Sequence, residues 1–249
     1  MSSETEDPNE PQARQRRTIC SHCDRPTPTC ICHCLPEERI HLRRSHCFVL
    51  QHPHEAKRKN RSLPFVRLCL DDASTTIFVG RHLNRIPSAL AFVQQPGFVP
   101  WVLYPEDKDA LSLSQALQQY RDDRPILLIA LDASWKHARE MYRFNAPILE
   151  GCLRIRLAPS DWVQQLFIPR RFDIRAPPSP DHFSTAEALA WTLSQIEEDV
   201  SIYEAIVKPL DWMVGQWRTL EQERKARMRH ASGEATAVDA ATPSPEEEE

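Results

Sequence analysis

The sequence has no long hydrophobic run. No stretch of its 249 residues approaches the roughly 20 consecutive apolar residues that a membrane-spanning helix needs. The N-terminal residues are polar and acidic, and they lack the apolar core of a secretory signal peptide. We also find no internal repeat. These absences favour an intracellular protein, in the cytoplasm or nucleus, that has no membrane partner.

Basic residues are missing from both ends of the chain. Residues 1–10 carry four Asp and Glu and residues 231–249 carry six, with no Lys or Arg in either segment. The body between them keeps all 31 Lys and Arg against 25 Asp and Glu, although the formal charge of the whole chain is −4. A basic body favours a polyanionic partner such as nucleic acid. The polar composition of 1–17 and 231–249 predicts disorder there.

The body alternates apolar runs with segments typical of helices. We expect strands at 47–51, 75–80, 101–104, 125–131 and 152–157. We expect helices at 112–123, at 134–144 and from 183 to about 230. Pro209 is expected to break the last of these. Capping-box patterns predict two helix starts, at Ser112 with Gln115 and at Ser184 with Glu187. Continuous apolar runs are typical of strands buried on both faces, so the pattern predicts an α/β domain with a largely parallel sheet.

Several polar residues follow these buried strands. Asp132 comes directly after the most apolar run and could cap the next helix, although Ser134 could do that and leave the acid free for catalysis or binding. His52 and Glu55 also follow a strand directly. Arg175 begins a Pro-rich loop, where its guanidinium could hold a carboxylate or phosphate or form a surface ion pair. Ligands of parallel sheets bind beyond the carboxyl ends of the strands, where Asp132 lies.

A cysteine cluster lies near the N-terminus. Its five thiols belong to Cys20, Cys23, Cys30, Cys32 and Cys34. A C-x2-C pair followed closely by a C-x-C pair can direct four thiolates at one structural zinc ion. The alternative, a pair of disulfides, is rare in intracellular proteins. Spacing alone leaves open whether Cys32 or Cys34 is the fourth ligand.

The motifs occur together in an order that resembles the DTW-domain proteins, and most closely their tRNA-uridine aminocarboxypropyltransferases. The matching segments are "CSHCDRPTPTCICHCLP", "HPHEAKRKNRS", "WVLYPEDKDA", "LDASW" and "IRAPPSPDHFSTAEALA", which together span about Thr18 to Trp191. Ser134 stands where the family has Thr, and the hydroxyl of an Asn-Thr pair is displaced to Ser62. The family pattern makes Cys34 the extra thiol and implies Cys20, Cys23, Cys30 and Cys32 as zinc ligands.

The resemblance implies a SPOUT-like fold, a trefoil-knotted parallel sheet with a small N-terminal zinc-binding module. The module would span 18–36 and the catalytic domain 37–230, between a disordered N-terminus (1–17) and a disordered acidic tail (231–249). The implied reaction moves the 3-amino-3-carboxypropyl group of S-adenosyl-L-methionine to N3 of an unpaired tRNA uridine and releases methylthioadenosine. The partners are therefore tRNA and S-adenosyl-L-methionine, with no obligatory protein partner evident.

The resemblance also implies site residues. Asp132, Ser134 and Trp135 would be catalytic. The residues that would bind the co-substrate are His52, Glu55, Asn60, Tyr104, Arg175, Ser184, Thr185 and Glu187. Two rival functions remain on the same residues: modification of ribosomal RNA or RNA methylation by the same fold, and a non-catalytic, zinc-dependent RNA-binding module.

Overall fold

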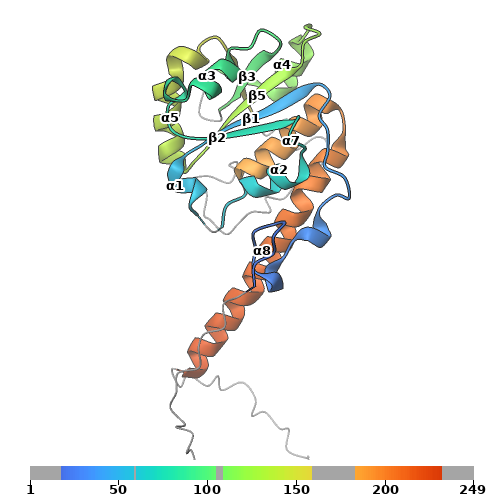
Figure 1. The fold of residues 1–249 in the computed structure, drawn as a ribbon, viewed down its shortest axis with the longest axis vertical. Coiled ribbons are helices and arrows are strands. Elements are labelled where there is room, and N and C mark those ends of the chain that lie inside the picture. Colours follow the sequence, from blue (N-terminus) through green and yellow to red (C-terminus); the bar gives the residue numbers. More distant parts are fainter. Residues whose placement is uncertain (1–17, 59, 105–108, 159–182, 232–249) are drawn as a thin grey trace, which may run out of the picture.

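Six parallel strands form one sheet in the order β2-β1-β5-β3-β6-β4 (Figure 1). The computed structural model describes residues 18–58, 60–104, 109–158 and 183–231, so the expected disordered ends, except Ala231, lie outside the described residues. The strands are β1 (Ser45–Gln51), β2 (Thr75–Val79), β3 (Val99–Leu103), β4 (Leu111–Ser112), β5 (Ile126–Asp132) and β6 (Leu153–Arg156). The central strands β1 and β5 pair along their full length, which places Gln51 opposite Asp132.

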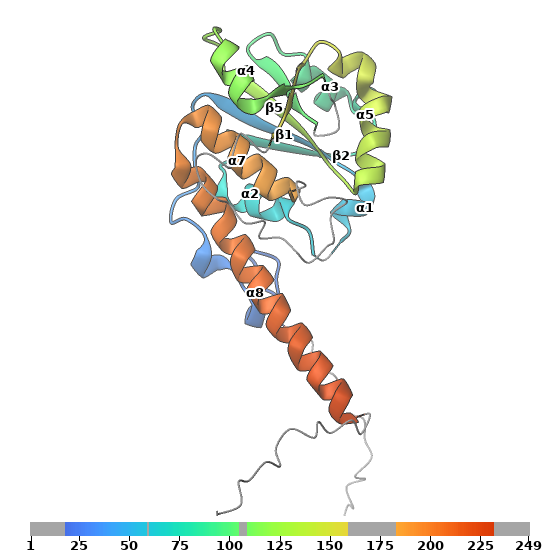
Figure 2. The ribbon, with the colours of Figure 1, turned by 180° about the vertical axis from the view of Figure 1, so that it is seen from behind.

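Helices cover both faces of the sheet (Figures 1 and 2). One face carries α2 (Leu63–Cys69), α4 (Leu113–Gln119), α7 (Thr185–Glu197) and α8 (Val200–Ala231), and the other carries α3 (Pro87–Val93) and α5 (Trp135–Leu149). Alternate residues of β1 point to opposite faces, so Cys47 and Val49 join one hydrophobic cluster while Phe48 and Leu50 join the other. This burial on both faces explains the continuous apolar runs of the sequence.

The sequence predicted five of the strands to within two residues at each end. It missed β4, which has only two residues. Both predicted capping boxes are confirmed, at Ser112 with Gln115 and at Ser184 with Glu187. The helix after Ser112 ends at Gln119, earlier than expected.

The expected helix break at Pro209 is wrong. α8 continues through Pro209, and the interruption lies at Glu198, which ends α7 with a left-handed φ of 57°. Proline leaves the carbonyl four residues earlier without its usual helical donor. That carbonyl, of Ala205, accepts a hydrogen bond from the Cys69 thiol at 3.3 Å instead. A contact from α2 therefore satisfies the group that Pro209 cannot.

α7 and α8 form an antiparallel pair that spans the sheet and returns. At the start of α7 Thr185 bonds to Asp132, at the carboxyl edge of the sheet. At its end Glu197 accepts hydrogen bonds from the backbone N–H groups of Arg43 and Arg44 and from the Ser45 hydroxyl, where β1 begins. α8 then runs back along α7 and extends past the carboxyl edge (Figures 1 and 2). Neither α8 nor any other described helix is apolar enough over sufficient length to cross a membrane.

Glu197→Ala is predicted to lower the free energy of unfolding by about 1–3 kcal/mol, because the donors at the start of β1 lose a charged acceptor. Glu198→Ala is the matched control, since the Glu198 side chain is 75% exposed and pairs with the exposed Arg44 side chain. Such a surface pair contributes about 0–1 kcal/mol. Urea denaturation of both variants measures the difference, and equal losses would contradict a special role for Glu197.

Candidate functional site

Asp132 ends β5 with a buried side chain, and the residue is only 4% exposed. Its Oδ2 accepts a hydrogen bond from Gln51 Nε2 at 2.7 Å, and its Oδ1 accepts one from Thr185 Oγ1 at 2.6 Å. It does not cap α5, because Ser134 occupies the N-cap position. The carboxylate instead joins the ends of two neighbouring strands to the start of α7.

Three histidines lie beside this acid. The backbone N–H of His52 donates to the Asp132 carbonyl oxygen at 2.8 Å, which continues the pairing of β1 with β5. The His52 ring stacks on His137 of α5, with centroids 4.2 Å apart and planes 2° apart, and His54 meets both rings edge-on. Ser134 Oγ lies 3.1 Å from His137 Nδ1. The predicted residues Ser134 and His52 are thus linked through an imidazole that the sequence analysis did not single out.

The nitrogens of His52, His54 and His137 lie within 4.8 Å of one another, a spacing that would suit a metal ion. The ring geometry does not suit one. The lone pair of an imidazole lies in the ring plane, and the parallel planes of His52 and His137 keep their lone pairs from converging on one point. In addition, His52 Nδ1 already accepts a hydrogen bond from the His54 backbone N–H at 3.1 Å, as the N-cap of α1 (Pro53–Ala56). We therefore interpret these three histidines as side chains that pack beside Asp132 and not as a metal site.

The other predicted site residues differ in their surroundings. Glu55 is buried and pairs with Arg58 at 3.4 Å, and Tyr104 stacks on Tyr142 of α5 with centroids 4.0 Å apart. Asn60 is exposed and Trp135 is half-buried in the first turn of α5. Arg175 lies outside the described residues.

Ser184 and Glu187 form the capping box that begins α7, with Thr185 between them as the residue that bonds to Asp132. The Ser62 hydroxyl stands one position after the Thr of the family's Asn-Thr pair. It accepts a hydrogen bond from the Ala186 backbone N–H at 3.4 Å. Four hydroxyl or acidic side chains therefore fix how α7 begins. Among them, Thr185 donates a hydrogen bond to Asp132.

Sequence reasoning missed Gln51 and His137. Gln51 ends an otherwise apolar strand, as Asp132 does, and this shared pattern could have indicated it. His137 lies three residues after Ser134 in a predicted helix, so the two side chains were bound to be neighbours. Which strand lies next to β5 was not readable from local sequence, and the Gln51–Asp132 contact depends on that.

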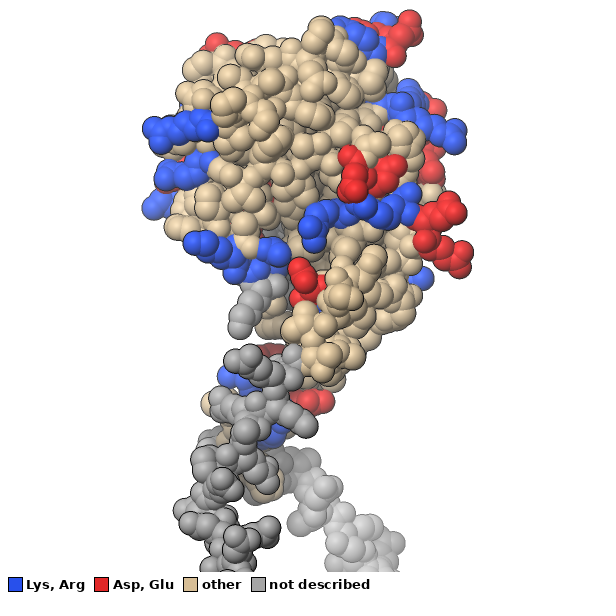
Figure 3. Space-filling model, viewed as in Figure 1, with Lys and Arg blue, Asp and Glu red and all other residues tan. Residues whose placement is uncertain are grey.

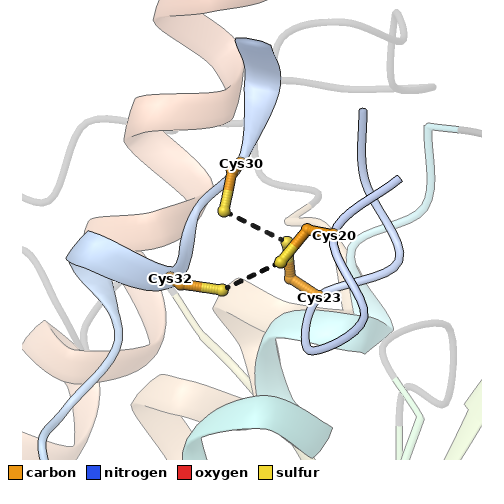
Figure 4. A group of neighbouring side chains, drawn as sticks. All are labelled: Cys20, Cys23, Cys30 and Cys32. Atoms are coloured by element: carbon orange, nitrogen blue, oxygen red, sulfur yellow. Dashed lines mark hydrogen bonds between the residues drawn. The ribbon is translucent and has the colours of Figure 1, made fainter. Parts of the chain in front are cut away.

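The cysteine cluster forms a second centre (Figure 4). The sulfurs of Cys20, Cys23, Cys30 and Cys32 all lie within 4.8 Å of one another, with Cys20 and Cys32 3.6 Å apart and Cys23 and Cys30 3.7 Å apart. A tetrahedral zinc ion with bonds of about 2.3 Å would separate its sulfurs by roughly 3.8 Å. The backbone N–H groups of Cys23 and His22 lower the pKa of the Cys20 thiol to about 6. The donor set therefore fits a zinc ion.

Cys34 is buried near these sulfurs but does not belong to the group. The segment packs on α8 and α2 through the residues around it. His33 accepts the indole N–H of Trp212, and the Arg25 guanidinium donates to the Met213 sulfur and lies over the Phe65 ring at 5.2 Å. The module is thus fixed to the same helix that extends past the carboxyl edge.

Comparison with known proteins places these two centres in context. The family model of the DTW domain matches residues 17–218. The chain is 30% identical to "tRNA-uridine aminocarboxypropyltransferase A" of Arabidopsis thaliana over 205 residues, which covers 77% of each protein. It is 28% identical to "tRNA-uridine aminocarboxypropyltransferase 2" of Macaca fascicularis over 201 residues, which covers 79% of this chain and 62% of that protein. No solved structure matches the chain.

The lowered pKa values of His52, next to Asp132, and of His46 predict that the free energy of unfolding depends on pH. Burial, followed by the neighbouring His137 and His54, lowers the pKa of His52, and burial also lowers the pKa of His46. Unfolded imidazoles titrate near pH 6.5, so below that pH the unfolded chain binds more protons than the folded one. The stabilising contribution is complete above about pH 6.5 and falls as the pH drops.

We expect the free energy of unfolding to decrease from pH 7.5 to 5.5, and to decrease less in His52→Gln. Chemical denaturation at each pH measures both slopes. The wild-type protein, measured in the same buffers, is the reference for both slopes. An unchanged slope in His52→Gln would show that this imidazole does not stay neutral in the fold.

Proposed function

The chain belongs to the DTW-domain family, and we propose that it is a tRNA-uridine aminocarboxypropyltransferase. The observation that carries the proposal is the family match over residues 17–218, which contains both centres described above. The names of the curated relatives from plant and animal sources support the reaction class. The chain spans 62% of the length of the macaque relative, so the activity of that whole protein is extended to this chain as part of the proposal.

The proposed reaction joins uridine N3 to the terminal methylene carbon of the aminocarboxypropyl group. The bond from that carbon to the sulfonium sulfur breaks and its electron pair stays on sulfur, so methylthioadenosine leaves as a neutral thioether. The N3 proton must leave the ring. The protein must also present this carbon, rather than the methyl group, in line with N3, and orientation of this kind is worth up to roughly 7–11 kcal/mol.

We propose that Asp132 accepts the N3 proton or orients the N3–H group. Gln51 and Thr185 hold its carboxylate in one position through hydrogen bonds to its two oxygens. Ser134 and Trp135 follow in the same loop and first helical turn, where Trp135 could stack on the uracil. A uridine paired in a stem hides N3, so the target is an unpaired tRNA nucleotide.

The remaining predicted residues are proposed to bind S-adenosyl-L-methionine. Arg175 would hold its carboxylate. His52 and the buried Glu55, both directly after β1, would take its amino or hydroxyl groups, with Asn60 and Tyr104 at the rim of the same edge. Ser184, Thr185 and Glu187 would contribute through the start of α7, which they already define.

We propose that residues 18–36 form a structural zinc module and residues 37–230 the catalytic domain. The sulfur spacing supports zinc, because four thiolates at these separations would otherwise repel one another. The family resemblance further implies a trefoil knot and an intracellular location. The connection from β6 to α7, through residues 159–182, lies outside the described residues.

Asp132→Asn is predicted to reduce tRNA-dependent release of methylthioadenosine by about 100-fold or more, within the usual range for the loss of a general base. The amide preserves shape but cannot take the N3 proton. Asp72→Asn is the control, since that side chain is 92% exposed and pairs with Arg39. Asp72 precedes β2, at the amino edge of the sheet and therefore opposite Asp132. Mass spectrometry of the tRNA nucleosides identifies the product, and a methyl adduct or wild-type turnover in Asp132→Asn would contradict the proposal.

Cys32→Ser is predicted to lower bound zinc well below the one ion per chain expected of the wild type. Cys34→Ser should keep one ion, because Cys34 is not among the four grouped sulfurs. Elemental analysis of the purified, dialysed proteins measures the ratio. Equal zinc loss in both variants would show that the ligand set is different from the four proposed here.

A further inference from the structure

The last four turns of α8 project from the protein as an arm, which we define as residues 218–231. Before it, Leu210, Met213 and Val214 are buried against the body and the cysteine module. From Arg218 to His230, Glu221 is half-buried and every other residue is exposed. Figures 1 and 2 show the same thing from opposite sides, with no other described element around the end of the helix.

Interactions within the arm stabilise its helix only weakly. A helix that buries no apolar face gains stability chiefly from propensity and side-chain pairs, which are individually weak. Glu221 pairs with Arg224 at 2.9 Å and with Lys225 at 3.9 Å, and Glu223 pairs with Arg227 at 3.9 Å. Exposed pairs of this kind are worth about 0.3–0.5 kcal/mol. They do not neutralise the arm, because its 14 residues carry five Lys and Arg against two Glu.

The direction of α8 places this charge on the functional side of the protein. α7 runs from Asp132 to the start of β1, and α8 returns along it, so the arm emerges beyond the carboxyl edge where Asp132 lies. The cysteine module packs on α8 just before the arm begins. At about 1.5 Å per residue, Arg229 lies roughly 24 Å along the helix from Met213.

We propose that the arm binds the phosphate backbone of the tRNA whose uridine is modified at the carboxyl edge. The inference rests on the proposed function and deepens it, because it names the surface that holds the RNA away from the reacting base. Charge complementarity favours a polyanion, and the surface ion pairs of the arm can be exchanged for phosphate contacts at small cost. Lys and Arg also gather along the rim of the face seen in Figure 3, including its lower edge above the arm.

The arm also lies almost wholly outside the part of the chain that the family model matches. The DTW family model matches residues 17–218, and the arm after Arg218 lies beyond that match. The proposed tRNA contact therefore lies outside the matched domain that contains Asp132 and the cysteine cluster. A helix end that only accommodates its own dipole would need a cation or two in the last turn. Here Arg224 and Lys225 lie more than a turn before the end, which that explanation does not cover.

The test compares two double variants of the full chain that remove the same charge. Arg227→Gln with Arg229→Gln changes the arm, and Arg43→Gln with Arg121→Gln changes exposed residues near the opposite, amino edge of the sheet. Gln is a good helix former, and circular dichroism checks that the helix content is kept. Binding of unmodified tRNA is measured by fluorescence anisotropy over a series of salt concentrations.

The arm variant is expected to raise the Kd for tRNA roughly tenfold and to reduce the slope of log K against log salt by about 1.5, since each lost phosphate contact removes about 0.7–0.9. The control pair leaves both unchanged. Equal effects of the two pairs, or no effect of the arm pair, would overturn the inference. So would loss of binding to phosphatidylserine vesicles at unchanged tRNA affinity. Failure of the proposed function is seen separately, as no tRNA-dependent methylthioadenosine release by the wild type.

Discussion

The hydrogen bonds around the Asp132 carboxylate hold together the parts of the structure that matter for function. Gln51 and Thr185 donate to its two oxygens and thereby connect β1, β5 and α7. A carboxylate that is 4% exposed would cost several kcal/mol if it had no partners, and hydrogen bonds to a charged group offset about 1.5–3 kcal/mol each. The start of α7 is consequently tied to the same acid that we place at the reacting base. Changes at Thr185 would affect both helix position and chemistry.

The position of α7 in turn determines the course of α8. Because α7 is fixed at Asp132 and at the start of β1, α8 must return toward the carboxyl edge, and it carries the cysteine module with it. The cysteine module, the acid and the basic arm are therefore on one side of the molecule although they come from different parts of the sequence. A large polyanionic substrate could touch all three at once. This arrangement explains why a small module with few apolar residues is attached to a helix rather than to the sheet.

Local patterns predicted most of the elements, and long-range contacts account for what they missed. The apolar runs around Val49 and Ile129 predicted buried strands, and the Ser184–Glu187 box predicted the start of α7. The break expected at Pro209 was wrong because the Cys69 thiol satisfies the Ala205 carbonyl, and no local pattern reports that contact. For the same reason the pairing of Gln51 with Asp132 could not be predicted, since strand order is a property of the whole sheet. The grouping of Cys20, Cys23 and Cys30 was foreseeable from their close spacing, whereas the choice of Cys32 over Cys34 came from the family resemblance.

The central claim is that the Asp132 carboxylate meets the N3–H group of an unpaired uridine beside the sulfonium donor. A crystal structure of the protein with methylthioadenosine and a uridine-containing tRNA fragment tests it most directly. The account predicts uridine N3 within about 3.2 Å of a carboxylate oxygen of Asp132, with the thioether sulfur of methylthioadenosine beside N3. A uridine bound elsewhere, or one whose N3 faces His52 or His137 instead of Asp132, would contradict it.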